Sequence, residues 1–107
     1  IQIGAVDYHT LLEVVSVMRG FFIHSPRDNV AVATRDLKAG TMVVVPLNEK
    51  PVKVKLLDDI PLGHKFALRR IEAGAAVVKY GEAIGVATKT ASAGAHVHVH
   101  NLKSQRF

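Results

Sequence analysis

Four short segments of this 107-residue chain each place an apolar residue three positions after a glycine. The segments are LKAGTMV (37–43), IPLGHKF (60–66), IEAGAAV (71–77) and ASAGAHV (91–97). A glycine permits a tight turn, including one with positive φ, and the apolar residue then begins the inward face of the next strand. Because the copies are unevenly spaced, they indicate turns within one compact β domain and not a solenoid.

The sequence between these turns is typical of short β-strands, and no convincing helix follows residue 20. In PVKVKLL, for example, Val52, Val54 and Leu56 alternate with Lys53 and Lys55, as in a strand with one buried face. We therefore predict an all-β fold of about seven or eight short strands. The expected strands lie in FFIH (21–24), NVAVAT (29–34), TMVVVP (41–46), PVKVKLL (51–57), HKFALRRI (64–71), AAVVKYG (75–81), AIGVATKT (83–90) and AHVHVHN (95–101).

Residues 1–20 differ from the rest and are interpreted as an N-terminal extension to a domain at residues 21–107. Tyr8–Met18 contains no glycine or proline and has apolar residues at helical spacing, which predicts a short helix. The alternative is that Met18 is the natural initiator, in which case residues 1–17 have no role in the fold.

The charge balance favours an anionic partner. The chain has 14 Lys and Arg against 9 Asp and Glu, a formal net charge of +5. Nucleic acid is not expected, because aromatic residues are few and no basic cluster is interleaved with stacking residues. No apolar run approaches the roughly 20 residues that span a bilayer, and Glu13 interrupts the apolar run near the N-terminus. We therefore expect a cytoplasmic protein without a signal peptide or a membrane partner.

Several classes of catalytic machinery are missing from the sequence. There is no cysteine, which excludes disulfides and thiolate chemistry. There is also no G-x-S-x-G nucleophile elbow and no phosphate loop of the G-x-x-x-x-G-K form. Any chemistry must therefore depend on the histidines, lysines and carboxylates.

The stretch Ile23–Asn101 resembles the N-terminal SAF-type domain of the altronate/galactarate dehydratase family. The resemblance is carried by IHSPRDNVAVA (23–33), DLKAG (36–40), IPLGHKFALRRIEAGAAVVKYGEAIGVAT (60–88) and AGAHVHVHN (93–101). It implies a small β-clip fold within a lyase that dehydrates a sugar acid such as altronate or galactarate. It also implies a divalent metal, Fe²⁺ or Mn²⁺, in the complete enzyme, which this chain need not hold by itself.

In that family the SAF-type domain precedes a larger catalytic region, which a chain ending at Phe107 does not include. The resemblance therefore implies a larger partner, either a C-terminal catalytic domain or a separate subunit, and no activity of this chain alone. The small subunit of sulfolactate sulfo-lyase is similar and gives an alternative substrate. A non-catalytic carbohydrate-binding or chaperone-like module is a further alternative, and exposed edge strands favour self-association as a homo-oligomer.

The motif HVHVH places three histidines at alternate positions. In an extended strand His96, His98 and His100 share one side, while Val97 and Val99 face the core. Adjacent histidines lie roughly 7 Å apart and the outer pair about 13 Å apart, so only two neighbours can hold one metal without a bend. We take His96 and His98 as the candidate metal ligands. The alternative is a polar strand face in contact with water.

The turn Gly63-His64-Lys65 presents an imidazole and an ammonium group together, which suits a carboxylate ligand. The family resemblance includes this turn and implies a catalytic role for His64 and Lys65. The alternative is that they are two polar side chains on an exposed turn. Candidate contacts to the acid substrate are Asn29, Tyr80, Glu82, His98, His100 and Asn101.

Three of these candidates have structural alternatives. Asp28-Asn29 is typical of a turn closed by side-chain bonds to the backbone. Tyr80 and Glu82 either line a polar pocket or bond across a turn, beside glycines whose role is structural.

Overall fold

The computed structural model describes residues 20–47 and 50–104. Every regular element in this part of the chain is a β-strand, which confirms the predicted all-β class. Among these residues no helix is long and apolar enough to cross a membrane. The helix predicted for Tyr8–Met18 lies outside the described residues, and the domain boundary near residue 20 stays a prediction.

The described strands follow the predicted segments closely, with one addition at the C-terminal end. They are β1 (Phe21–Phe22), β2 (Val30–Ala33), β3 (Met42–Leu47), β4 (Lys50–Lys55), β5 (Lys65–Ala67), β6 (Ala76–Lys79), β7 (Glu82–Ala87), β8 (His96–Val97) and β9 (Leu102–Ser104). The sequence did not predict β9, because LKS lacks both alternation and β-branched residues. Its pairing with β7 is a tertiary contact.

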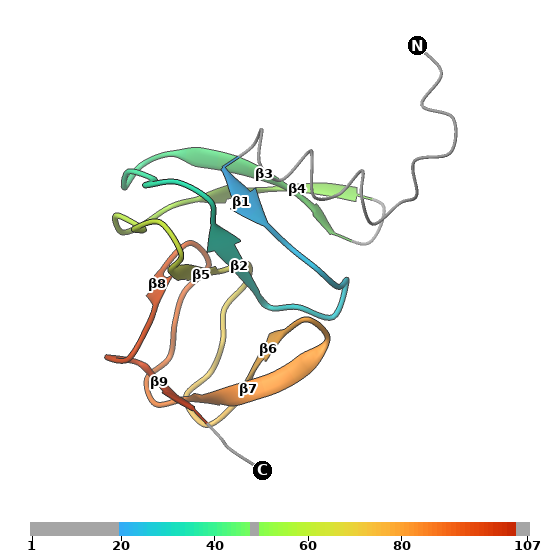
Figure 1. Ribbon diagram of the computed structural model, residues 1–107, viewed down its shortest axis with the longest axis vertical. Coiled ribbons are helices and arrows are strands. Elements are labelled where there is room, and N and C mark those ends of the chain that lie inside the picture. The colour runs from blue at the N-terminus through green and yellow to red at the C-terminus, as the bar shows by residue number, and fades with distance from the viewer. Residues whose placement is uncertain (1–19, 48–49, 105–107) are drawn as a thin grey trace.

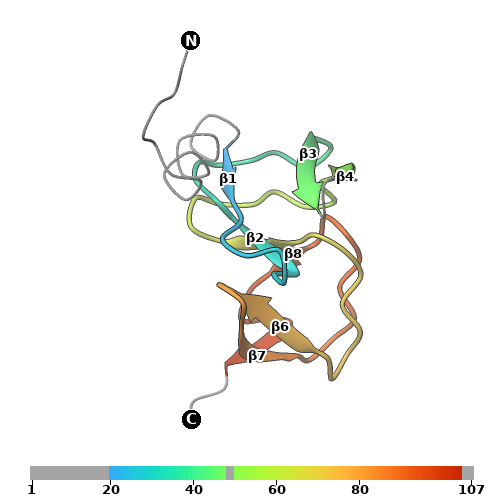
Figure 2. The same ribbon diagram turned by 90° about the vertical axis from the view of Figure 1, so that its right-hand side faces the viewer.

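The strands form three antiparallel sheets stacked along the long axis of the molecule (Figure 1). The four-stranded sheet β1-β2-β5-β8 lies in the middle, with the β3–β4 hairpin on one side and the β6-β7-β9 sheet on the other (Figure 2). Two apolar cores fill the spaces between these layers. One contains Phe66, Leu56 and Ile60, and the other contains Val30, Val77 and Val97.

The register of the middle sheet decides which side chains face each core. Lys65 is paired with Val32 on one side and with Val97 on the other, so the three side chains share a face. That face is turned toward the β6-β7-β9 sheet, because Val97 belongs to the core on that side. Phe66 and its partner His96 therefore point the other way, toward the β3–β4 hairpin.

The four glycine turns behave as predicted. Each glycine has a positive φ between 83° and 88°, and the residue three positions later is buried. The glycines are Gly40, Gly63, Gly74 and Gly94, followed by Val43, Phe66, Val77 and Val97. Two pairs of turns face each other through the bridges Leu37↔Ile60 and Ile71↔Ala91. The sequence repeat therefore corresponds to two similar pairs of turns within one domain.

One predicted burial pattern is wrong. Val54 and Leu56 on β4 are buried as expected, but Val52 is 40% exposed. Val54 and Leu56 pack in the core that the hairpin shares with the four-stranded sheet, and so does Val45, the partner of Val52 on β3. Val52 itself lies outside that core, which alternation did not predict.

Candidate functional site

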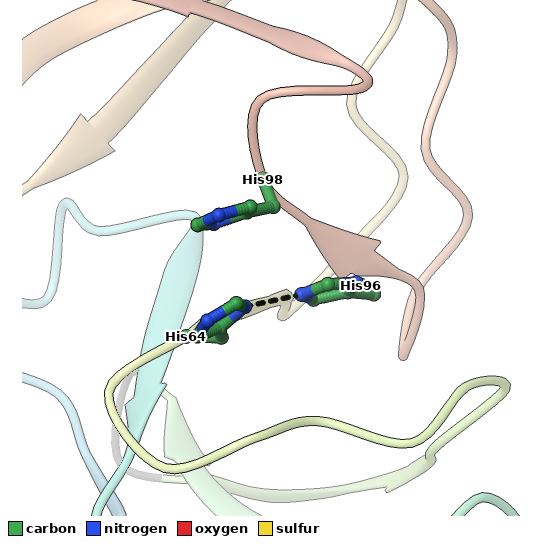
Figure 3. A group of neighbouring side chains, drawn as sticks. All are labelled: His64, His96 and His98. Atoms are coloured by element: carbon green, nitrogen blue, oxygen red, sulfur yellow. Dashed lines mark hydrogen bonds between the residues drawn. The ribbon is translucent and has the colours of Figure 1, made fainter.

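Three imidazole rings from two distant parts of the chain meet at one place (Figure 3). The Nδ1 atom of His64 lies 2.8 Å from Nε2 of His96, within hydrogen-bond distance. The ring of His98 stacks on that of His64, with centroids 4.0 Å apart and planes 17° apart. One nitrogen from each ring lies within 4.8 Å of the others. We call His64, His96 and His98 the histidine cluster.

Two features of the backbone create the histidine cluster. The first is the antiparallel pairing of β5 with β8, which brings Lys65 opposite Val97 and so places His64, just before β5, near His98. The second is the Gly63 turn, in which the backbone N–H of His64 donates to the carbonyl of Pro61. His64 and His96 are 32 residues apart in the sequence, so the pairing of the strands is what brings them together.

The HVHVH segment is not one extended strand, which corrects the sequence prediction. Strand β8 ends at Val97, and a turn follows in which the N–H of Asn101 donates to the carbonyl of His98. Val99 is consequently 82% exposed and does not face the core. The rings of His96 and His100 have centroids 5.3 Å apart, far less than an extended strand would allow.

Asn101 holds this turn in shape. Its side-chain oxygen accepts the N–H of His98 at 2.9 Å, and its side-chain nitrogen donates to the carbonyl of His96 at 2.9 Å. The residue itself is buried. Asn101 therefore positions two members of the histidine cluster, while its predicted contact with substrate stays a prediction.

The surroundings of two of the rings favour the neutral form by lowering the pKa. Burial is the main cause that lowers the pKa of His96, followed by the nearby His64, His100 and His98, against a smaller opposing effect of Asp58. Partial burial also lowers the pKa of His98, with further contributions from His64, Lys65 and His100. A neutral imidazole is the form that accepts a proton or binds a metal.

The side chain of Lys65 lies on the opposite face of the middle sheet from His96, and its charge contributes to the lowered pKa of His98. Its pKa is lowered first by burial and second by the charge of Lys79 on β6. An ammonium group that is partly desolvated and near a second cation is stabilised by binding an anion. The joint role predicted for His64 and Lys65 in binding an acid stays a prediction.

Asp58 is a neighbour of the site that the sequence did not indicate. Its carboxylate accepts the backbone N–H of His96 at 2.9 Å, across 38 residues of sequence. No motif links the two positions, since Asp58 belongs to the loop that follows β4. Only the folded arrangement shows a carboxylate beside the histidine cluster.

The remaining predicted residues lie in a different neighbourhood. Asn29 is buried, and its side chain bonds to the carbonyl of Ala76 and the N–H of Val78 at 2.9 and 2.7 Å. Tyr80 and Glu82 lie at the β6–β7 turn and are exposed. Within the described chain, none of these three predicted residues forms a hydrogen bond or ring contact with the histidine cluster.

The histidine cluster lies at the surface and not in a closed pocket. All three of its residues are half-buried. Two hollows of about 230 and 350 Å³ lie elsewhere, beside the Asp36 and Asp59 turns and along β3, and no predicted site residue lines either of them. Within the described residues the histidine cluster is therefore an open, half-buried surface feature.

The donor set of the histidine cluster fits a divalent metal, although the ring orientations do not yet suit one. Three imidazoles are ligands that zinc, iron and related ions accept, and they leave coordination positions open. The three ring planes, however, are within 8–21° of parallel, so their lone pairs do not converge on one point. Binding would require the rings to rotate and the His64–His96 hydrogen bond to break.

Fold and site together define a small β domain with a cationic, imidazole-rich surface. Comparison with known proteins assigns it further. Residues 19–105 match the family described as the altronate/galactarate dehydratase SAF domain. The chain belongs to this family, which confirms the resemblance found in the sequence.

Relatives of known function are similar to this chain over most of its length. It is 51% identical over 77 residues to altronate dehydratase of Escherichia coli (strain K12), covering 72% of this chain and 15% of that protein. It is 40% identical over 87 residues to altronate dehydratase of Bacillus subtilis (strain 168), covering 81% and 17%. It is also 41% identical over 66 residues to (2R)-sulfolactate sulfo-lyase subunit alpha of Paracoccus pantotrophus, covering 62% and 98%.

The fraction of each relative that aligns with this chain differs between the dehydratases and the sulfo-lyase subunit. The chain spans about one sixth of the length of the two altronate dehydratases but nearly all of the sulfo-lyase alpha subunit. The same domain therefore occurs both as a small part of a long enzyme and as a subunit. Both arrangements imply a further catalytic region.

Proposed function

We propose that this chain is the substrate-binding domain of a sugar-acid dehydratase, and that a larger catalytic region completes its active site. The observation that carries the proposal is the histidine cluster at one end of the β5–β8 pair, with Lys65 near enough to His98 to lower the pKa of that ring. A surface that combines neutral imidazoles with a partly buried ammonium group suits an acid whose neighbouring carbon must lose a proton.

Lys65 supplies the charge that binds the substrate carboxylate. Its ammonium group acts as a point charge, and partial burial strengthens its attraction for an anion. Neutralising the carboxylate lowers the cost of removing the proton from the adjacent carbon, because negative charge then accumulates on a group that is already paired. Lys65 thus both orients the acid and favours the first step of dehydration.

His64 is the member of the histidine cluster best placed to exchange a proton with the substrate. Its Nδ1 atom is engaged with His96, which leaves Nε2 as the nitrogen that can donate or accept a proton. His98 stacks on this ring and holds its plane. The principal base and further ligands are assigned to the larger catalytic region.

A divalent metal would be held by His64, His96 and His98 after the ring rotation described above. When bound, such an ion polarises the oxygen atoms of the substrate and so promotes loss of the hydroxyl group. His96 and His98 were the ligands expected from the sequence, and the fold adds His64.

A sulfo-lyase subunit is the second candidate, because two sulfo-lyase alpha subunits are also similar to this chain. The similarity covers 98% of one alpha subunit and 96% of the other. Sulfolactate also carries a carboxylate, which Lys65 would bind in the same manner. The two candidates therefore share a site and differ in the substrate.

The first test is an NMR titration of the full chain with altronate, galactarate and sulfolactate. We expect chemical-shift changes centred on Lys65 and the histidine cluster. Lys65→Met should weaken binding about tenfold, the usual effect of losing one charge-assisted contact. Lys53→Met is the matched control, because Lys53 is exposed on β4 and pairs with the exposed Val44 on the outer face of the hairpin.

Two results would count against the proposal. One is the lack of any shift with all three acids while the spectrum shows a folded domain. The other is equal weakening by the Lys65 and Lys53 variants, which would indicate nonspecific attraction to a basic protein. If sulfolactate alone binds, the sulfo-lyase candidate replaces the dehydratase.

A further inference from the structure

Three exposed aliphatic side chains border the histidine cluster. Val99 and Leu62 are 82% and 62% exposed, the two highest values among the large apolar side chains that the structure describes, and Leu57 is 53% exposed. Exposed apolar residues that gather at one place, and are not scattered singly, mark an interaction surface. We call Leu57, Leu62 and Val99 the apolar rim.

Two residues of the apolar rim adjoin the histidine cluster in the sequence. Val99 follows His98, and Leu62 lies two positions before His64. Their segments leave the cluster on different sides, because the loop leading into His64 passes below it in Figure 3 and the coil after His98 leaves above it. A partner that covers both segments therefore also covers the imidazole rings between them.

Leu57 is brought to the cluster by the fold. Its backbone N–H donates to the carbonyl of Gly94 at 3.0 Å. The next residue, Asp58, accepts the backbone N–H of His96 with its carboxylate at 2.9 Å. These two bonds fasten the loop after β4 to the segment that leads into β8. Leu57 therefore lies beside the cluster although it is far from His96 in the sequence.

Hydrogen-bonded turns hold the apolar rim in place. The turn at 61–64, which carries Leu62, is closed by a backbone hydrogen bond of 2.9 Å. The turn at 98–101, which carries Val99, is closed by a backbone bond of 3.0 Å and by the side chain of Asn101. Apolar groups that are already fixed lose little conformational entropy when a partner covers them, so they favour docking.

Carboxylates lie beside the apolar rim. Asp58 and Asp59 follow Leu57, and Asp36 accepts the backbone N–H of Leu62 at 2.8 Å. All three acidic residues are exposed. A complementary surface is therefore apolar at its centre and carries arginine or lysine at its edge.

The β3–β4 hairpin exposes a second apolar group, which fits docking less well. Met42 and Val44 on β3 are 54% and 43% exposed. They lie opposite Lys55 and Lys53, whose long side chains can cover apolar neighbours while the charge stays in water. A partner on this face would also leave the histidine cluster uncovered.

We propose that the apolar rim and its bordering carboxylates form the surface on which the larger catalytic region docks. The inference rests on the proposed function, which assigns the completion of the site to that region. Similarity covers 15% and 17% of two altronate dehydratases, so most of each enzyme lies outside the part that resembles this chain. A second copy of this chain fits less well, because a two-fold pair would bring the same carboxylates together.

The test measures the accessibility of single cysteines, which is possible because the chain has no cysteine of its own. Leu62→Cys and Val99→Cys are compared with Met42→Cys, the matched control on the hairpin. Each variant is labelled with a maleimide in the full chain alone and in a hybrid enzyme. The hybrid enzyme is altronate dehydratase of Escherichia coli in which this chain replaces the matching segment. Mass spectrometry of the peptide that contains the new cysteine gives the labelling rate.

We expect all three cysteines to react rapidly in the chain alone. In the hybrid enzyme the labelling of Leu62→Cys and Val99→Cys should slow at least about tenfold, because a side chain in a docked interface reacts only while the interface is open. The labelling of Met42→Cys should change by less than about twofold, since the hairpin stays in contact with water. This measurement does not require the hybrid enzyme to be active.

A second variant tests whether the apolar contacts themselves hold the interface. Val99→Asp places a charge in the apolar rim, which a docked partner would have to bury. In the hybrid enzyme it should make Leu62→Cys react about tenfold faster, close to its rate in the chain alone. Val44→Asp on the hairpin is the control and should leave Leu62→Cys protected. Ring resonances of His96 and His98 that are unchanged by Val99→Asp in the chain alone show that the cluster is intact.

Three results would overturn the inference. One is equal labelling of Leu62→Cys and Val99→Cys in the hybrid enzyme and in the chain alone. Another is protection of Met42→Cys instead, which would place docking on the hairpin. The third is protection in the chain alone that grows with its concentration, which would make a second copy the occupant. Protected cysteines in a chain that binds none of the three acids would refute substrate binding and leave the docking surface standing, so the two proposals fail separately.

Discussion

The Nδ1 atom of His64 lies 2.8 Å from the Nε2 atom of His96, and this contact joins the turn before β5 to strand β8. One nitrogen must donate and the other accept, so at least one of the two rings is neutral. The contact therefore couples the protonation of both rings to the shape of the site. The same two nitrogens must separate before the rings can bind a common metal.

Removal of His98 should abolish tight binding of a divalent metal. We expect His98→Ala to weaken binding of Mn²⁺ by at least tenfold, because a site with three imidazoles retains only two. Isothermal titration calorimetry of the full chain measures the loss. His100→Ala is the comparison, since His100 lies outside the group of three nitrogens within 4.8 Å of one another. Equal affinity of the His98 variant and the wild type would exclude the three-histidine site.

His96 and His98 should titrate below the ordinary histidine pKa. Burial and the neighbouring cations disfavour the protonated form of both rings in the folded state. The unfolded chain then binds more protons than the folded chain just below pH 6.5, so stability should fall as the pH is lowered through that range. NMR titration of the ring protons and urea unfolding at several pH values measure the two effects. Midpoints at or above 6.5 would contradict the prediction.

Asn101→Ala should both destabilise the domain and disturb the histidine cluster. The variant leaves the N–H of His98 and the carbonyl of His96 without their partner, at a cost of about 1–3 kcal/mol. Asn29→Ala provides the comparison, because that buried amide also bonds two backbone groups but lies at β6. Urea unfolding should show losses for both variants, whereas only Asn101→Ala should shift the ring resonances of His96 and His98. Unchanged ring resonances would mean that the turn does not depend on Asn101.

The two glycine turns at positions 40 and 94 should differ in their tolerance of alanine. Both have positive φ, which costs a residue with a Cβ about 1–2 kcal/mol. A Cβ at Gly40 meets open space, but one at Gly94 collides with the backbone carbonyl of Lys55. Gly94→Ala should therefore lower the free energy of unfolding by at least about 3 kcal/mol, clearly more than Gly40→Ala. Similar midpoints for the two variants in urea would refute this difference.

The sequence predicted most of the fold because its signals are local. A glycine followed three residues later by an apolar residue encodes a turn and the first inward side chain, and both hold at Gly40, Gly63, Gly74 and Gly94. How far burial extends along a strand is not encoded by adjacent residues. Val52 shares the alternation of Val54 but is 40% exposed, and β9 pairs with β7.

The candidate site was predicted in part, from residue type and from the family resemblance. GHK and HVHVHN supplied His64, Lys65, His96 and His98, which are the groups near the site's centre. The sequence could not show that β8 ends at Val97, because the bend depends on Asn101 bonding back across the turn. It also gave no signal for Asp58, whose carboxylate reaches His96 from 38 residues away.

The sequence by itself therefore determined the all-β class, the turns and the kinds of side chain available for chemistry, since each depends on a few adjacent residues. Only the tertiary structure decided which of those side chains meet. Pairing of β5 with β8 brings His64 to His96, and the sheet register turns Lys65 toward the β6-β7-β9 sheet. Such contacts depend on strand register and loop closure over long separations, which no local pattern encodes.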